Sequence, residues 1–414
     1  MSPTFVTVLL RQKGEHMTPP IPRKPSEPIS IARSYFPTED IEIFHREADS
    51  ILRGRLSMGV WVEKFQAAAA KAHETQYAIA TNSCTSALEV SLLACGVKPG
   101  DRVIVPVQTF IATGMAVHNI GGIPVFADIR METLCLDPDE LERLADPSIK
   151  AVILVHFGGL ITPDIVQIQA ICRKYDWALI EDAAHAHGAR FQGRPAGSFG
   201  ATACFSYYPT KVLTTGEGGM ITTDDPEIAE ICRSYQLRGQ DTDLTGEQFA
   251  YPYGRNIRLT ELAALMGVLQ YTRLYEYVAA RRAVAAIYDK FLADEPSITV
   301  PTVPGACYHN FWLYTIILPE GVDRETIKKK CEEDWEISTA WSYFPPMHLM
   351  PVFKNLYGMR NGSLPVAEAV LSRIMCLPVH PLISAENARC VAECFLHEYR
   401  AAGRSKSYDN RRDV

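Results

Sequence analysis

Short apolar runs separated by amphipathic stretches follow one another along residues 60–182, and this pattern predicts strands alternating with helices. The runs with the length of strands are Tyr77–Thr81, Arg102–Pro106, Pro124–Ala127, Ala151–Val155 and Ala178–Ile180. The stretches with the character of helices are Val60–His73, Ser86–Cys95 and Pro163–Tyr175. Several runs are apolar throughout, which is typical of a mostly parallel sheet covered by helices on both faces. The predicted fold class is therefore α/β.

The pattern changes after residue 260 and predicts a second, smaller domain. A long helical stretch over 260–292 is expected to link the two domains. Beyond it we expect an α+β arrangement of strand Trp312–Leu318, helix Arg324–Asp334 and a final helix Ala385–Tyr399. The predicted division is an arm over 1–30, a large domain over 31–272, a small domain over 273–402 and a polar tail over 403–414.

The predicted arm carries prolines at positions 19, 20, 22, 25 and 28 among charged residues and has little to bury, so we expect it to be flexible. Met1 and Met17 are both candidates for the first residue of the protein. The longest apolar stretch near this end, Phe5–Leu10, is far too short to cross a bilayer.

Composition excludes several classes of protein. Of the 414 residues, 47% are hydrophobic and 21% are charged, as in an ordinary globular protein. The formal net charge of −7 gives no basic field for nucleic acid or an anionic membrane, so neither is an expected partner. The eleven cysteines are scattered without CxxC spacing, which favours reduced thiols. We expect a cytoplasmic enzyme.

The candidate chemistry centres on Lys211 and Asp182. Lys211 lies in a loop between the strand-like run Ala203–Tyr208 and the glycines of 216–219. Asp182 lies earlier in the chain, at the end of the apolar run Trp177–Ile180. A lysine in such a loop and an acid at a strand end suit pyridoxal phosphate (PLP). The lysine forms a Schiff base with the cofactor aldehyde, and the carboxylate keeps the pyridine nitrogen protonated. Glu181 would point to the other face of the strand and is the weaker candidate.

Other cofactor classes find less support in the sequence. No GxGxxG follows a first strand, and the glycines of 216–219 are not followed by the lysine of a phosphate-binding P-loop. His185 and His187 are a histidine pair, but no Cys, Asp or Glu at suitable spacing completes a metal site. We therefore expect no metal.

Five motifs in order resemble the DegT/DnrJ/StrS family of PLP-dependent sugar aminotransferases. They are Asn82–Leu88, Val105–Phe110, Glu181–Ala186, Phe205–Ser206 with Thr210–Lys211, and Gly216–Gly219. The resemblance extends from about residue 30 to residue 400. It implies a fold-type-I, aspartate-aminotransferase-like structure with a mostly parallel central sheet and a smaller C-terminal α+β domain.

The resemblance also implies roles for individual residues. Lys211 would hold PLP and move the proton between the substrate Cα and the cofactor, and Asp182 would pair with the pyridine nitrogen. Phe110 would stack on the pyridine ring, and His185 would contact the cofactor. The phosphate would be bound by Cys84, Thr85, Ser206 and, from the partner subunit of a homodimer with shared active sites, Asn256. Thr85 opens a helix, where an anion is favoured. The candidate substrate contacts are Tyr208, Arg255, Arg258, Tyr343 and His348.

The expected reaction moves an amino group from glutamate or glutamine to PLP and then to a keto-sugar, expected to be nucleotide-linked. The sequence departs from the family pattern at three positions. Cys84 replaces glycine, which makes the phosphate loop slightly bulkier. Tyr208 replaces histidine and Arg255 replaces tyrosine, and these two lie near the expected acceptor site and leave the acceptor open. An aminocyclitol aminotransferase and an aminohydroxybenzoate-synthase-like enzyme remain alternatives. A PLP-dependent deoxysugar dehydratase would have histidine in place of Lys211, and an inactive regulatory homologue would have lost Lys211 or Asp182.

Overall fold

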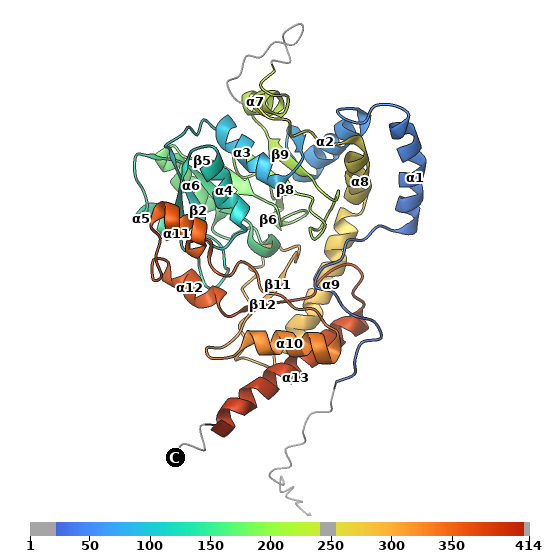
Figure 1. The fold of residues 1–414 in the computed structure, drawn as a ribbon, viewed down its shortest axis with the longest axis vertical. Helices are drawn as coiled ribbons and strands as arrows, with labels where there is room; N and C mark the ends of the chain where they lie inside the picture. The colour runs from blue at the N-terminus through green and yellow to red at the C-terminus, as the bar shows by residue number, and fades with distance from the viewer. Residues whose placement is uncertain (1–21, 241–253, 410–414) are drawn as a thin grey trace, which may run out of the picture.

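A seven-stranded sheet forms the centre of the protein. The structure is a computed structural model that describes residues 22–240 and 254–409 (Figure 1). The strands are β1 (Tyr77–Thr81), β2 (Arg102–Pro106), β3 (Ile123–Ala127), β4 (Ile149–Val155), β5 (Ala178–Asp182), β8 (Thr202–Ser206) and β9 (Gly219–Thr223). Their order is β1-β9-β8-β5-β4-β2-β3. β9 is antiparallel to β1 and β8, and the other neighbours are parallel. The predicted α/β class is confirmed.

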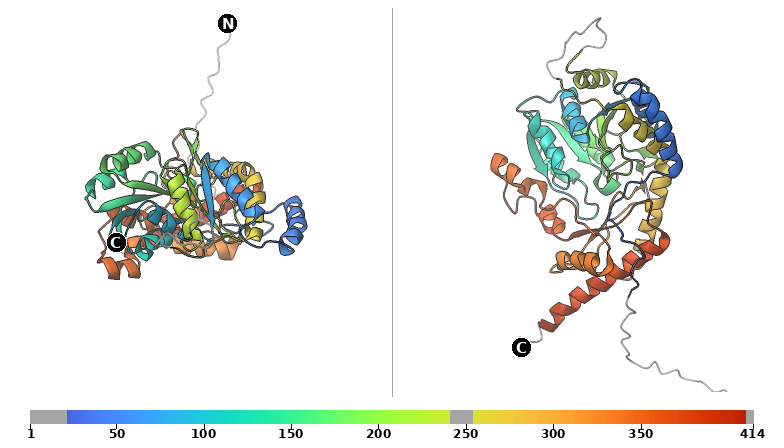
Figure 2. Two further views of the ribbon diagram at one scale, coloured as in Figure 1. Left: turned by 90° about the horizontal axis from the view of Figure 1, so that it is seen from above. Right: turned by 45° about the vertical axis from the view of Figure 1, so that its right-hand side comes forward.

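Helices cover this sheet. They are α2 (Val60–His73), α3 (Cys84–Ala94), α4 (Ile111–Asn119), α5 (Pro138–Arg143), α6 (Ile165–Tyr175), α7 (Pro226–Gln236) and α8 (Glu261–Thr272). α3 packs on α4 and α7, α5 packs on α6, and α2 packs on α8. Every residue of β8 and β9 is buried, which requires cover on both faces of the sheet. Helix α1 (Thr38–Leu52) lies at the margin of the molecule beside α8 (Figures 1 and 2).

A second core lies around the antiparallel pair β11 (Tyr314–Ile317) and β12 (Ile374–Leu377). The helices that pack there are α9 (Leu274–Leu292), α10 (Arg324–Trp335) and α13 (Ala385–Asp409). We call this unit the small domain and the seven-stranded sheet with its helices the large domain. The remaining elements are β6 (Arg190–Phe191), β7 (Arg194–Pro195), β10 (Cys307–Tyr308), α11 (Pro351–Tyr357), α12 (Pro365–Leu371) and the short 3-10 helices Phe157–Gly159 and Met347–Leu349.

Several predicted elements differ from the structure in their bounds. The helical stretch expected over 260–292 is two helices, because α8 ends at Thr272 and α9 begins at Leu274. Arg273, between them, binds Asp40 of α1 through its guanidinium group. The strand expected from Trp312 begins only at Tyr314. The helix expected from Ser86 begins at Cys84, because the Ser83 side chain caps it by accepting a hydrogen bond from the Ser86 N–H.

The two cores do not follow the predicted domain boundaries closely. Most of the predicted arm lies outside the described residues, but Ile29 is buried in the small-domain core and pairs with Ile337. Met347 and Phe353, expected in the small domain, pack into the core of the large domain. Helix α13 continues past residue 402 into the range expected as a polar tail. The boundaries themselves stay a prediction. Among the described helices, none is long and apolar enough to cross a membrane.

Candidate active site

The candidate residues gather at one edge of the central sheet. Asp182 is the last residue of β5, and Ser206 is the last residue of the parallel strand β8. Helix α3 begins three residues after β1 ends, at the same edge. The carboxyl ends of parallel strands are where open α/β sheets bind their ligands.

Asp182 is a buried carboxylate with few partners. Its Oδ2 accepts a 2.8 Å hydrogen bond from Thr113 Oγ1, and its Oδ1 accepts a 3.2 Å bond from the Ala184 N–H. Burial raises the pKa of Asp182, and the two hydrogen bonds and the charge of Lys211 offset only part of this rise. A cationic donor placed against this carboxylate would stabilise its ionised form.

The neighbouring Glu181 has a different task. It points away from Asp182 and accepts hydrogen bonds from His156 Nε2 at 2.7 Å and from the N–H groups of Gly197, Phe199 and Gly200. Burial alone would raise the pKa of Glu181, but these donors outweigh it and lower the pKa. Glu181 therefore ties β5 to the loop before β8, as its place on the opposite face of the strand predicted.

Lys211 follows β8 in a loop that turns back over the sheet edge. Its side chain is partly exposed, while burial of the amine lowers its pKa to about 8. Asp182 and Cys84 are the charged and titratable groups that act most strongly on it. The Nζ atom lies 4.1 Å from the centroid of the Trp312 ring. A lysine with this pKa has a sizeable neutral fraction near neutral pH, which is the nucleophilic form.

Three rings gather beside Lys211. His185 stacks on Trp312, with centroids 3.7 Å apart, and its plane is nearly parallel to that of Tyr343, with centroids 5.9 Å apart. The Tyr343 hydroxyl and His185 Nε2 are 2.9 Å apart. Burial holds the pKa of His185 well below its usual value, so the ring is neutral. Phe110, which precedes α4, is 59% exposed and lies 6.5 Å from the Tyr343 ring.

The start of α3 offers donors for an anion. Ser83 caps the helix, and the first N–H groups of a helix, here those of Cys84 and Thr85, have no partner inside it. β9 begins beside this turn, because Gly219 pairs with Ser206 and a Cβ at Gly219 would overlap the Ser83 backbone. Gly219 therefore allows the turn before α3 to lie close to the end of β8, where Ser206 is.

The structure places the other predicted residues in different surroundings, and it engages His348 outside this cluster. His348 is buried and pairs through Nε2 with Glu368 at 3.0 Å, so the structure does not bring it to the site. Arg255 pairs with Glu89 at 3.0 Å. Asn256 is exposed and forms a backbone bridge with Leu237. Tyr208 is 49% exposed near Lys211, and Arg258 is partly exposed.

The family follows from comparison with known proteins. The model of the DegT/DnrJ/EryC1/StrS aminotransferase family matches residues 38–396. The chain belongs to this family. The predicted resemblance is thereby confirmed, and with it the assignment of the protein as an aminotransferase-family enzyme.

Two of the relatives of this aminotransferase are named for GDP- or dTDP-linked amino sugars. GDP-perosamine synthase of Caulobacter vibrioides is 38% identical over 340 residues, which are 81% of this chain and 90% of that protein. The dTDP-3-amino-3,4,6-trideoxy-alpha-D-glucose transaminase of Micromonospora megalomicea is 36% identical over 335 residues, 79% of this chain and 87% of that protein. The crystal structure of NtdA from Bacillus subtilis with bound cofactor PMP has a TM-score of 0.81 at 28% identity and covers 88% of this chain and 83% of its own.

Sequence reasoning missed three residues that this aminotransferase brings to the site. Thr113 binds Asp182, Trp312 contacts Lys211, and Asn310 holds the His185 loop by donating hydrogen bonds to the carbonyls of His185 and His187. Trp312 and Asn310 come from the segment before β11, far along the chain, so no local pattern pointed to them. Among the described residues, no group of three His, Cys, Asp or Glu side chains is placed to hold a metal ion.

Proposed function

We propose that this protein is a PLP-dependent aminotransferase that transfers an amino group from glutamate or glutamine to the keto group of a nucleotide-linked sugar. The observation that carries the proposal is the meeting of Asp182, Lys211 and the start of α3 at one sheet edge. An acid, an amine and an anion site are the three groups that the pyridine nitrogen, the aldehyde and the phosphate of PLP require.

The residues present fit this cofactor. The Asp182 carboxylate is buried with a raised pKa, and a protonated pyridine nitrogen would supply the cation that it lacks. His185 Nδ1 is buried without a hydrogen-bond partner in the structure, which agrees with a polar contact to the cofactor. Phe110 offers an exposed aromatic face at the same edge. Cys84, Thr85 and Ser206 would bind the phosphate.

Each residue of the candidate active site then has a chemical role. When bound, PLP supplies an aldehyde that carries the amino group and a ring that draws in electrons. Asp182 holds the proton on the pyridine nitrogen. Lys211 Nζ would bind the cofactor and, when free, would move the proton of the donor Cα to C4′ of the cofactor. In the second half of the reaction it would move a proton from C4′ to the acceptor carbon. The loops that follow β2, β5 and β8 orient these groups from rigid strands.

The acceptor class rests on the two relatives whose names specify GDP- and dTDP-linked amino sugars. Tyr208 is exposed near Lys211, and Tyr343 borders the His185 ring, so both are candidates for contact with the sugar. Arg258 is the candidate for the diphosphate. Arg255 is engaged by Glu89 within its own chain, which makes it the weaker candidate. His348 would act only through the packing of the Tyr343 segment.

We also propose a homodimer with shared active sites. Asn256 is exposed on its own chain and has no side-chain hydrogen bond within the described residues, so it is available to the phosphate site of a partner subunit. The margin formed by α1 and the start of α2 exposes apolar side chains that a partner would cover: Ile41, Leu52, Leu56 and Val60.

The decisive experiment has two stages. The purified protein should take up PLP and turn yellow, and borohydride should attach the cofactor to the peptide that contains Lys211. Lys211→Ala should lose the label and the activity, whereas Lys98→Ala, on an exposed turn, should keep both. The loaded protein should then aminate members of a panel of GDP- and dTDP-linked keto-sugars. Labelling of a different lysine would contradict the cofactor assignment, and amination of a free cyclitol ketone alone would contradict the acceptor class.

A further inference from the structure

Trp312 contacts three parts of the active site at once. Its ring centroid lies 4.1 Å from Lys211 Nζ. The same ring stacks on His185, with planes 18° apart. Its Nε1–H donates a 2.7 Å hydrogen bond to the carbonyl of Thr210, the residue before Lys211. The Trp312 side chain, from the segment just before β11, therefore touches the lysine amine, the lysine loop and the His185 ring.

The backbone around Trp312 is held firmly. Asn310 accepts the Trp312 N–H through Oδ1 at 2.9 Å, while its Nδ2 donates to the carbonyls of His185 and His187. Asn310 is fully buried and packs so closely on Gly159 that a Cβ at that position would overlap Asn310 Oδ1. The place of the Trp312 ring is therefore set by the large domain and not by a mobile loop.

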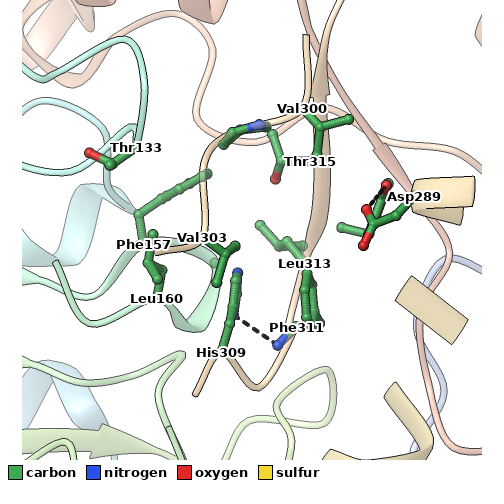
Figure 3. Close-up of a pocket in the computed structure, with 13 residues that line it drawn as sticks. Thr133, Phe157, Leu160, Asp289, Val300, Val303, His309, Phe311, Leu313 and Thr315 are labelled. Carbon is green, nitrogen blue, oxygen red and sulfur yellow. Dashed lines mark hydrogen bonds between the residues drawn. The ribbon is translucent and has the colours of Figure 1, made fainter. Parts of the chain in front are cut away.

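The neighbours of Trp312 face elsewhere. His309, Phe311 and Leu313 line a separate cavity of about 280 Å³ that Asp289 and Thr315 also border (Figure 3). Trp312 alone in this segment meets Lys211. The segment thus separates that cavity from the active site, and Trp312 is its contribution to the active site.

The ring matters because the Lys211 ammonium has few stabilising neighbours. Burial disfavours the charged amine. The charged and titratable groups that act on Lys211, or on which it acts, are Asp182, Cys84, His185 and His187. Only Asp182 supplies a negative charge near neutral pH, since burial raises the pKa of the Cys84 thiol well above its usual value and keeps both histidines neutral. An aromatic face attracts a desolvated ammonium through the ring quadrupole, and tryptophan does so best.

We propose that Trp312 is a positioning residue that holds the Lys211 ammonium over its indole face whenever this amine is not bonded to the cofactor. The inference rests on the proposed function, because a lysine that holds PLP must alternate between a bonded and a free state during turnover. By stacking on His185 as well, the indole keeps the free amine within reach of the reacting carbon, where it must accept and return a proton.

The test measures the amine directly in the apoprotein. Trace acetylation with acetic anhydride over a range of pH, with the Lys211 peptide quantified by mass spectrometry, gives the midpoint at which this amine becomes neutral. In Trp312→Leu the midpoint should fall by about half a pH unit or more, because the ammonium loses its aromatic partner. In Trp312→Phe it should fall by less. The matched control is Trp341→Leu, whose ring lies over Arg324 and Lys328, and it should leave the midpoint unchanged.

The outcomes separate the inference from the proposed function. A midpoint that stays or rises in Trp312→Leu overturns the role of the ring, because entry of water in place of the indole would then dominate. If Trp312→Leu fails to fold, Trp312→Phe decides: a midpoint below that of the wild type supports the role, and an equal midpoint overturns it. Uptake of PLP by the wild-type protein is scored separately. Its failure would contradict the proposed function even where the acetylation midpoints shift as expected.

Discussion

Thr113 donates a 2.8 Å hydrogen bond to Asp182 across the sheet edge, from α4 to the end of β5. The bond holds the Oδ2 atom, and together with the charge of Lys211 it offsets part of the rise in the pKa of Asp182 that burial causes. Thr113 in turn contacts Thr109 at 2.7 Å, so the acid is oriented by the same loop that carries Phe110.

The Asp182 carboxylate should be essential for turnover. Asp182→Asn should lower kcat by about 100-fold or more, because a neutral amide cannot hold the proton on the pyridine nitrogen. Thr113→Val is the matched variant, and the loss of one hydrogen bond to a charged group should cost roughly tenfold. Steady-state kinetics with a keto-sugar acceptor measure both. Near-normal rates in Asp182→Asn would remove this residue from the mechanism.

Glu181 and Asp182 should have opposite effects on stability. Glu181→Gln should lower the free energy of unfolding by about 3–5 kcal/mol, because it leaves buried N–H donors and His156 without their anion. Asp182→Asn should leave the stability of the apoprotein unchanged or higher, because burial makes that charge unfavourable. Urea unfolding measures both variants. Equal losses in the two would contradict the division between a structural and a functional acid.

The lowered pKa of Glu181 predicts that the free energy of unfolding depends on pH. The pKa of Glu181 is lower in the folded than in the unfolded protein, so its stabilisation is present above the unfolded pKa, about 4.3, and is lost as the pH falls through the folded value. The stability of Glu181→Gln should therefore fall less steeply on acidification than that of the wild type. Parallel curves would show that Glu181 titrates alike in both states.

Capture of PLP by the apoprotein should follow the titration of Lys211. Only the neutral amine attacks the aldehyde, so the rate should rise with pH and reach half its maximum at about 8. An unperturbed lysine would give a midpoint above about 10. Asp182→Asn should move the midpoint to lower pH, because the carboxylate raises the pKa of Lys211. Stopped-flow absorbance gives these rates, and a wild-type midpoint near 10 would contradict the burial of the amine.

The shared-site dimer predicts complementation. Lys211→Ala and Asn256→Ala should each be severely impaired, because each lacks one part of every site. Mixed subunits should recover part of the activity, since one of the two sites in a mixed dimer is intact. The activity of mixtures after subunit exchange, with sedimentation to establish the dimer, tests this. A fully active monomer would exclude the shared site.

Arg258 should contribute to the binding of the nucleotide-linked acceptor and not to the binding of the amino donor. Arg258→Glu should raise KM for a nucleotide-linked acceptor roughly tenfold or more, because a charge-assisted bond to the diphosphate becomes a repulsion. KM for the amino donor, measured in the same preparation, is the internal control. An equal rise for both substrates would indicate a change in the site as a whole.

Much of the fold was predictable from the sequence because its signals are local. Apolar runs such as Arg102–Pro106 predicted the strands of the central sheet, since strand period and burial are properties of neighbouring residues. Asp182 and Lys211 stood out because each follows a strand-like run within a motif. The family was predictable for the same reason, since its motifs are short and ordered along the chain.

The tertiary structure decided what depends on distant segments. The break lies at Arg273, which pairs with Asp40 of α1, a contact that helix periodicity does not contain. Trp312 meets Lys211 in a segment where Asn310 binds the His185 loop, more than 100 positions earlier in the chain. His348 looked like a pocket residue in its motif, yet its pairing with Glu368 buries it elsewhere. The alternation of apolar and polar positions in a strand depends on adjacent residues and can be read from the sequence. Hydrogen bonds between segments far apart in the chain form only when the two cores have packed together.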